Sequence, residues 1–173
     1  LRTWRDGWRH LRFLLLYSPR WLFLYPGIVL LLLGVGAGIA LIPGPVEVFG
    51  YPFDVAALVY AMAVALIGFQ AILFGVLARA FAMNEGLLPV SGGLQRAFRL
   101  VTLERGIAIG VLMFLGGIVL TVCSIVALGG DQPAFGGTSD AVRMAVPAAT
   151  LLVLGFETIM SSFFLSVLGL ARR

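Results

Sequence analysis

Several kinds of side chain on which soluble enzymes rely are scarce or absent in this sequence. It has no lysine, one histidine and one cysteine, and 12% of its 173 residues are charged. The lone Cys123 excludes an intrachain disulfide and a thiolate metal cluster, and its apolar surroundings favour a packing role. His10 has no neighbour with which to bind a metal. Since phosphate-binding loops, Asp-x-Asp and Ser/His/Asp sets are also missing, we predict no catalytic residue and no metal site.

Apolar residues are abundant instead. They make up 61% of the chain, and the mean hydropathy is +1.07, which the surface of a water-soluble domain of this size would not tolerate. A bilayer core requires about 20 apolar residues per helical span. We therefore expect an all-α integral membrane fold of two helical hairpins, with four spans at about residues 21–42, 55–78, 106–128 and 144–170.

Two further segments have the pattern of interfacial helices. In residues 1–18 the spacing of Trp4 and Trp8 continues through leucines on one side, while the opposite side carries Arg2, Arg5, Arg9 and Arg12. This pattern predicts an amphipathic helix in the plane of the membrane surface, ahead of a transmembrane domain at 19–173. Residues 80–105 contain a second, weaker amphipathic pattern.

The arginines are distributed unevenly between the two sides of the expected bundle. Eleven of the twelve precede the first span, lie between the second and third, or close the chain, and Arg143 alone lies at the edge of the fourth span. The other two connections contain Glu47, Asp54, Asp131 and Asp140. By the positive-inside rule both termini are expected in the cytoplasm.

Glu157 is the most informative single residue, because an ionised carboxylate near the middle of a span is costly. One interpretation is a site for a proton, a cation or a polar substrate. The other is a structural carboxyl that contacts neighbouring helices, with Gln70 of the second span as its partner. The intramembrane polar residues that we consider candidates are Gln70, Glu157 and Ser161.

The arginines on the cytoplasmic side are the other candidates, because a guanidinium group at headgroup depth suits a phosphate. Their alternative role is to fix the topology and anchor the chain in lipid. The candidate lipid-phosphate ligands are Arg12, Arg20, Arg79, Arg96, Arg99 and Arg105, and the candidate interfacial anchors are Trp4, Trp8, Trp21, Arg2, Arg5 and Arg9.

A faint internal repeat accompanies small residues at four-residue spacing. Residues 66–70, LIGFQ, resemble residues 153–157, VLGFE, and Gly-Ile pairs open the first and third spans at residues 27 and 106. Such a repeat would be parallel, although apolar segments also match by chance. Small residues four apart favour close helix packing within or between chains; they are Gly34 and Gly38, Gly106 and Gly110, and Ala57, Ala61 and Ala65.

Three segments resemble a known family. They are LRTWRDGWRHLRFLLLYSPRWLFLYPG at 1–27, VTLERG at 101–106 and SSFFLSVLGL at 161–170, and they resemble the C-terminal membrane region of bacterial family 2 glycosyltransferases of the dolichol- or polyprenyl-phosphate mannose or glucose synthase type. The resemblance implies a cytoplasmic GT-A catalytic domain ahead of Leu1 that uses Mg or Mn to transfer a sugar from a nucleotide donor to polyprenyl phosphate. This chain would then be a fragment without a cofactor of its own.

The function expected from this resemblance is to anchor the enzyme in the bacterial inner membrane and to present its lipid acceptor. The expected partners are membrane lipids, polyprenyl phosphate, the chain's own catalytic domain and a second copy in a homo-oligomer. Nucleic acid is not expected, because the arginines alternate with membrane-seeking tryptophans. A small transporter or flippase-like bundle lined by Glu157 and Gln70, and a passive scaffold for a partner enzyme, remain as alternatives.

Overall fold

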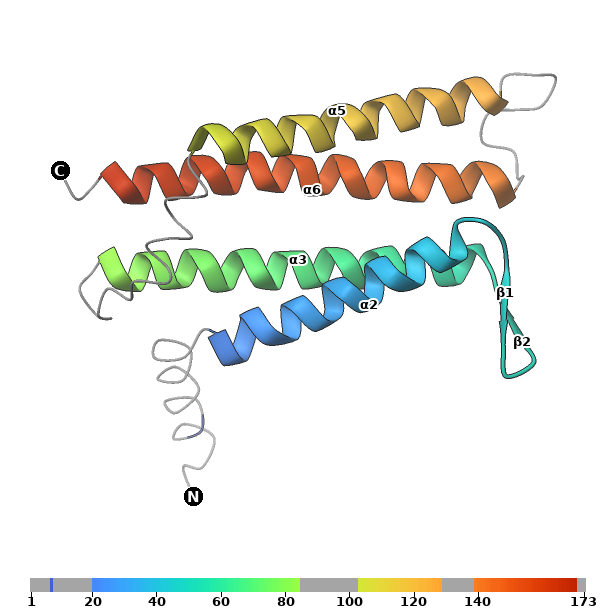
Figure 1. The fold of residues 1–173 in the computed structure, drawn as a ribbon, viewed down its shortest axis with the longest axis horizontal. Helices are drawn as coiled ribbons and strands as arrows, with labels where there is room; N and C mark the ends of the chain where they lie inside the picture. The colour runs from blue at the N-terminus through green and yellow to red at the C-terminus, as the bar shows by residue number, and fades with distance from the viewer. Residues whose placement is uncertain (1–6, 8–19, 85–102, 129–138, 171–173) are drawn as a thin grey trace.

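The computed structural model describes Gly7 and residues 20–84, 103–128 and 139–170. In these ranges four helices are long and apolar enough to cross a membrane, which confirms the predicted number of spans. The elements in chain order are η1 (Arg20–Leu24), α2 (Tyr25–Leu41), β1 (Val46–Val48), β2 (Tyr51–Phe53), α3 (Val55–Asn84), α5 (Leu103–Leu128) and α6 (Ser139–Leu170) (Figure 1). The first predicted interfacial helix lies outside the described residues apart from the helical Gly7, and of the second, predicted over 80–105, only the ends are described, where residues 80–84 belong to α3 and 103–105 to α5.

The helices form two hairpins that lie side by side. Within the described residues α2 packs against α3 and α5 packs against α6, while the two hairpins meet through α3 and α6. Helices α2 and α5 run in one direction and α3 and α6 run in the other (Figure 1). The start of α2 and the end of α6 therefore lie at the same end of the bundle, and the β1–β2 hairpin lies at the opposite end.

Two helix boundaries differ from the expected spans. Helix α3 continues to Asn84, beyond the expected end near residue 78, and α6 begins at Ser139 instead of near 144. Hydropathy marks only the apolar part of a helix. Alanine, methionine and arginine, which are frequent in residues 79–84, are good helix formers and extend the helix past it. Pro26 lies in the first turn of α2, where its missing N–H is not required, and a π-helical turn, η1, precedes it.

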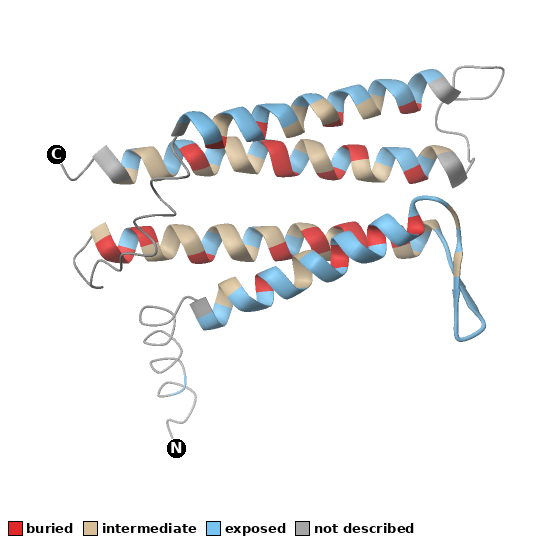
Figure 2. Ribbon diagram, viewed as in Figure 1, coloured by how far each residue is buried: buried red, intermediate tan, exposed pale blue. Residues whose placement is uncertain are grey.

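Many large apolar residues of the helices are exposed, and most of the buried positions, which are red in Figure 2, are held by small residues. Leu32 and Leu112 are 68% and 73% exposed, whereas Ala61 and Ala65 are buried. This arrangement is expected in lipid, where acyl chains solvate leucine as well as a protein interior does and helices associate through close packing. Cys123, interpreted from the sequence as a packing residue, is exposed instead, and it faces outward among these apolar side chains.

Glycines set the distance between the helices of each hairpin, and they do so in the same way in both. A Cβ built on Gly27 would lie 2.8 Å from the carbonyl oxygen of Gly68, and one built on Gly110 would lie 2.9 Å from that of Gly155. Four further pairs of residues take the same place in the two hairpins relative to these glycines: Ile72 and Ile159, Leu31 and Phe114, Gly34 and Gly117, and Ala65 and Leu152. The two hairpins therefore share one packing register.

This register supports the internal repeat and corrects one of its details. It places Gly68 in correspondence with Gly155, as the similarity of 66–70 to 153–157 predicts. At the start of the hairpins, however, the register makes Gly27 equivalent to Gly110 and not to Gly106, which lies one helical turn earlier. Equivalence depends on the position of a residue in the helix interface and not on its distance from the start of the span. The predicted close packing is confirmed within the chain at Gly34, Gly38, Gly110, Ala61 and Ala65.

Two glycines of α2 offer a matched test of this packing. A Cβ on Gly34 would overlap the backbone of Ala65, whereas one on Gly36 would meet nothing within 4 Å. We expect Gly34→Ala to destabilise the protein by about 1–3 kcal/mol because α2 must move away from α3. Gly36→Ala should be neutral or stabilising by up to about 1 kcal/mol. Unfolding of the intact protein in detergent measures both, and equal stabilities would contradict the close approach.

Candidate functional site

The polar pair predicted in the middle of the membrane is present. The side-chain amide of Gln70 in α3 donates a hydrogen bond of 2.7 Å from Nε2 to Oε1 of Glu157 in α6. The second carboxyl oxygen of Glu157, Oε2, is buried and has no hydrogen-bond partner among the described residues. The pair joins the two hairpins, since each residue comes from the helix that faces the other half.

The position of this contact follows from the repeat. Gln70 and Glu157 stand two residues after the equivalent Gly68 and Gly155. Equivalent residues can touch each other only near the axis that relates the two halves. The Gln70–Glu157 hydrogen bond therefore lies close to a pseudo-two-fold axis between α3 and α6, and because the hairpins are parallel this axis runs along the bundle.

The hydroxyl groups near Glu157 are used within α6 itself. Thr158 donates to the carbonyl oxygen of Leu154 at 2.6 Å, and Ser162 donates to that of Thr158 at 2.7 Å. Back-bonding of this kind satisfies a hydroxyl without a ligand or a neighbouring helix. Ser161, the third intramembrane candidate, lies one turn from Glu157 and is half-buried.

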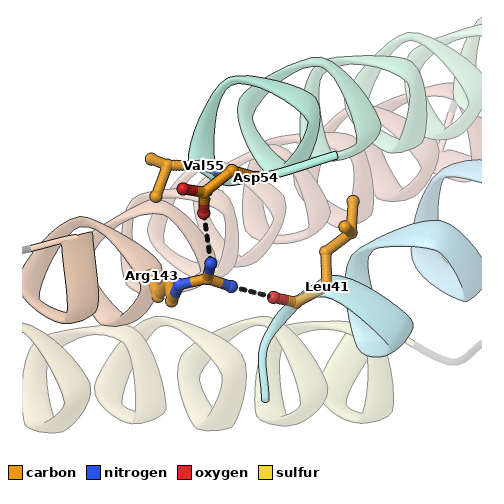
Figure 3. Close-up of polar contacts among 4 residues, drawn as sticks. All are labelled: Leu41, Asp54, Val55 and Arg143. Atoms are coloured by element: carbon orange, nitrogen blue, oxygen red, sulfur yellow. Dashed lines mark hydrogen bonds and ion pairs between the residues drawn. The ribbon is translucent and has the colours of Figure 1, made fainter. Parts of the chain in front are cut away.

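Arg143 forms a second contact between the hairpins, at the end where the β1–β2 hairpin lies (Figure 3). Its side chain is buried in the described structure. Nη1 donates to the carbonyl oxygen of Leu41 at 2.5 Å, and Nη2 forms an ion pair with Asp54 Oδ1. One residue of α6 thus binds the end of α2 and the start of α3.

This contact suits both helix ends electrostatically. Leu41 is the last residue of α2, where carbonyl groups lack helical partners and a cation is favoured. Asp54 precedes α3: its backbone carbonyl oxygen accepts the Leu58 N–H at 3.2 Å, as that of an N-cap residue does, and its carboxylate accepts a hydrogen bond of 2.7 Å from the Val55 N–H. Arg143 therefore neutralises the Asp54 carboxylate while it satisfies an otherwise unpaired carbonyl.

The sequence analysis did not single out Arg143 as a site residue. The signal was its isolation, since it is the one arginine near the acidic connections. A lone arginine at the edge of a span, on the side that carries Asp54, is costly unless it has a partner, and that cost could have suggested the pair. The carbonyl of Leu41 could not have been foreseen, because it depends on how the hairpins pack.

The lipid-phosphate candidates fall into two groups. Arg79 lies in the last two turns of α3 and is half-buried, and Arg105 lies in the first turn of α5 and is exposed. Both helix ends lie at the end of the bundle opposite the β1–β2 hairpin, where η1 begins at Arg20 (Figure 1). The other candidates lie outside the described residues; they are Arg12, Arg96 and Arg99.

The interfacial anchors are described only in part. Trp21 is 75% exposed and lies beside Tyr25, with their ring centroids 4.9 Å apart, at the same end as Arg79 and Arg105. The anchors of the first segment lie outside the described residues; they are Trp4, Trp8, Arg2, Arg5 and Arg9. In the described ranges no three histidine, cysteine or acidic side chains gather to hold a metal ion.

Two parallel hairpins with apolar outer faces and interhelical polar contacts define the chain as a multi-pass membrane domain. Residues 76–169 match the family model of the glycosyltransferase family 2 C-terminal transmembrane region. The chain belongs to this family. The match confirms the resemblance to the C-terminal membrane region of family 2 glycosyltransferases, and it covers the end of α3 together with α5 and nearly all of α6.

A curated relative extends the similarity to the first hairpin. The chain is 33% identical over 170 residues to the low-salt glycan biosynthesis hexosyltransferase Agl6 of Haloferax volcanii. The alignment covers 98% of this chain and 40% of the relative, so the chain spans about two fifths of that protein's length. No solved structure matches the chain.

Exchange of the two equivalent residues tests the Gln70–Glu157 contact. We expect Glu157→Gln to change the unfolding free energy by less than about 0.5 kcal/mol, since two amides still hydrogen-bond, whereas Gln70→Leu should cost about 1–2 kcal/mol because the carboxyl loses its donor. The exchanged double variant Gln70→Glu/Glu157→Gln should unfold like wild type in detergent. An exchanged variant no more stable than Gln70→Leu would contradict a contact near the pseudo-two-fold axis.

Arg143 should contribute more to stability than an exposed arginine does. We expect Arg143→Ala to cost about 2 kcal/mol, less than a fully buried pair because Asp54 can rehydrate. Asp54→Asn keeps an acceptor for the Val55 N–H and should cost less stability than Arg143→Ala. Arg143→Lys should be about as unstable as Arg143→Ala, because one ammonium group cannot bind both the Leu41 carbonyl and the Asp54 carboxylate as the guanidinium does. The melting temperatures of the intact variants in detergent compare them, and an unchanged value for Arg143→Ala would contradict this role.

Proposed function

We propose that this chain is the membrane domain of a glycosyltransferase that transfers a sugar from a nucleotide donor to polyprenyl phosphate, and that it anchors the enzyme and presents the lipid acceptor. The observation that carries the proposal is the position of Arg79 and Arg105. They come from different hairpins, yet both lie at one end of the bundle, where a phosphate at headgroup depth could contact guanidinium groups.

The catalytic chemistry is assigned to a separate domain. The aligned region makes up 40% of the length of the hexosyltransferase relative. The rest of that protein leaves room for a nucleotide-sugar-binding GT-A domain ahead of the part it shares with this chain. A divalent ion such as Mg or Mn would be bound in that domain. The described residues of this chain do not fit such an ion, since no three potential ligands gather in them.

The proposed orientation places the arginine-bearing end in the cytoplasm. That end carries Arg79 and Arg105, whereas the opposite end carries Glu47 and Asp54, with Arg143 neutralised by Asp54. By the positive-inside rule the first end faces the cytoplasm, where nucleotide sugars are available. In this arrangement a catalytic domain that precedes η1 would meet the lipid phosphate at the membrane surface.

The alternative of a transporter path gains no support from the geometry. Its two polar residues, Gln70 and Glu157, are hydrogen-bonded to each other, and the hydroxyls of Thr158 and Ser162 are bonded along α6. Because the Gln70–Glu157 hydrogen bond joins the two hairpins, it favours the structural role of Glu157.

Substitution of one arginine in the full-length enzyme tests acceptor binding. We expect Arg79→Ala or Arg105→Ala to raise the KM for polyprenyl phosphate about tenfold, the effect of losing one charge-assisted hydrogen bond, with little change in the KM for the nucleotide sugar. Arg172→Ala, which removes the same charge at a position that is not among the candidate phosphate ligands, is the control. Equal KM values for the acceptor in all four enzymes, wild type included, would refute a lipid-phosphate site at this end of the bundle.

A further inference from the structure

The short β1–β2 hairpin between α2 and α3 has one apolar and one polar face. In its antiparallel register Val46 pairs with Phe53, Glu47 with Pro52, and Val48 with Tyr51. Side chains of paired residues share a face, and faces alternate along a strand. Val46, Val48, Tyr51 and Phe53 therefore form one face, which we call the aromatic face, and Glu47 and Pro52 form the other.

Most of the aromatic face is uncovered. Tyr51 is 73% exposed, Phe53 44% and Val48 40%, and Phe49 at the tip is 97% exposed. The turn adopts positive φ at both central residues, 53° at Phe49 and 79° at Gly50, a conformation that favours Asn-Gly in two-residue hairpins. Phenylalanine occupies the first position despite this preference, so an aromatic side chain is retained where a polar residue would suit the backbone better.

The aromatic face is turned toward the bundle. Its first residue, Val46, packs against the buried cluster of Leu41, Leu58, Ala61 and Met62 at the ends of α2 and α3. The hairpin then extends transverse to the helices, past the end of α2 and the start of α3 and level with the end of α5 (Figure 1). Since the helices cross the membrane, a strand pair transverse to them runs along the membrane surface. The residues that follow Val46 on the same face consequently point toward the lipid that surrounds the bundle.

We propose that the β1–β2 hairpin lies on the lipid bilayer, with Val48, Tyr51, Phe53 and the tip residue Phe49 in the interfacial layer and Glu47 in water. Tyrosine is favoured at headgroup depth and phenylalanine on the apolar face of interfacial segments, and the face begins at Val46, which packs against the ends of the membrane-spanning helices. The occupant is thus the same membrane that the helices span, on the side opposite Arg79 and Arg105. The proposal requires only the membrane-spanning fold and does not depend on the proposed enzymatic function.

Spin labels on the two faces test this proposal directly. In the intact protein with Cys123 replaced by Ala, Tyr51→Cys and Glu47→Cys are labelled separately and reconstituted in nanodiscs that hold single copies. Power saturation then compares collisions with oxygen, which dissolves in the bilayer, and with a water-soluble nickel chelate. We expect the oxygen-to-nickel ratio to be several-fold higher at Tyr51 than at Glu47. Val48→Cys and Pro52→Cys repeat the comparison, one on each face, if either first variant is unstable.

Two outcomes would overturn the proposal. Equal, high access of nickel to both faces would mean that the hairpin stands away from the membrane in water. Protection of the aromatic face from both reagents in single-copy nanodiscs would mean that protein covers it instead of lipid.

Discussion

The absence of water inside a bilayer is the constraint on which this structure depends. Without water, burial of leucine against leucine gives little reason for helices to associate, so close backbone packing and polar contacts must hold them together. The chain uses the first within each hairpin, where Gly27 meets Gly68 and Gly110 meets Gly155. Between the hairpins, polar contacts run from Gln70 to Glu157 and from Arg143 to Asp54 and Leu41, and Val146 of α6 adds apolar packing against the cluster at the ends of α2 and α3.

The two halves share a packing register but differ in the chemistry that joins them. Gln70 and Glu157 are equivalent, and their difference is useful, since an amide is a donor that a carboxylate requires and two carboxylates would repel each other. Arg143 has no such counterpart. The equivalent position, twelve residues before Gly68 as Arg143 is before Gly155, is Ala56. The Arg143 contact, at the end of the bundle where the β1–β2 strands lie, therefore has no counterpart in the other half. Helix α6 of the second helical hairpin binds the ends of α2 and α3 in the first.

Much of this arrangement could be predicted from the sequence because membrane insertion leaves strong local signals. Long apolar runs predicted four spans, a lone Glu157 predicted a partner, and small residues such as Gly34 and Ala65 predicted close packing. The extension of α3 to Asn84 was missed because hydropathy measures lipid solubility and not helix length. The β1–β2 hairpin was missed because its strands are three residues long and its turn is Phe-Gly instead of Asn-Gly.

The residue types of the candidate site and the side of the bundle that they share were predictable, but the contacts between the helices were not. Arginine suits phosphate wherever it occurs, so the sequence could nominate Arg79 and Arg105 individually. That they share one end of the bundle follows from helix direction, which the alternation of spans already determines. By contrast, the contact of Arg143 with the Leu41 carbonyl depends on a backbone group that has no sequence signature, and it could be found only after α6 was placed against the first hairpin.

The two ends of the bundle consequently present different surfaces to the membrane that surrounds them. At one end, Arg79 and Arg105 place positive charges on helices of different hairpins. At the other, Asp54 and Arg143 neutralise each other, and the exposed groups described there include the aromatic side chains of the β1–β2 hairpin and Glu47. Under the proposed anchoring of the β1–β2 hairpin in the interfacial layer, the domain would be held at a defined depth, which would also set where the guanidinium groups stand relative to the proposed lipid phosphate at the other surface.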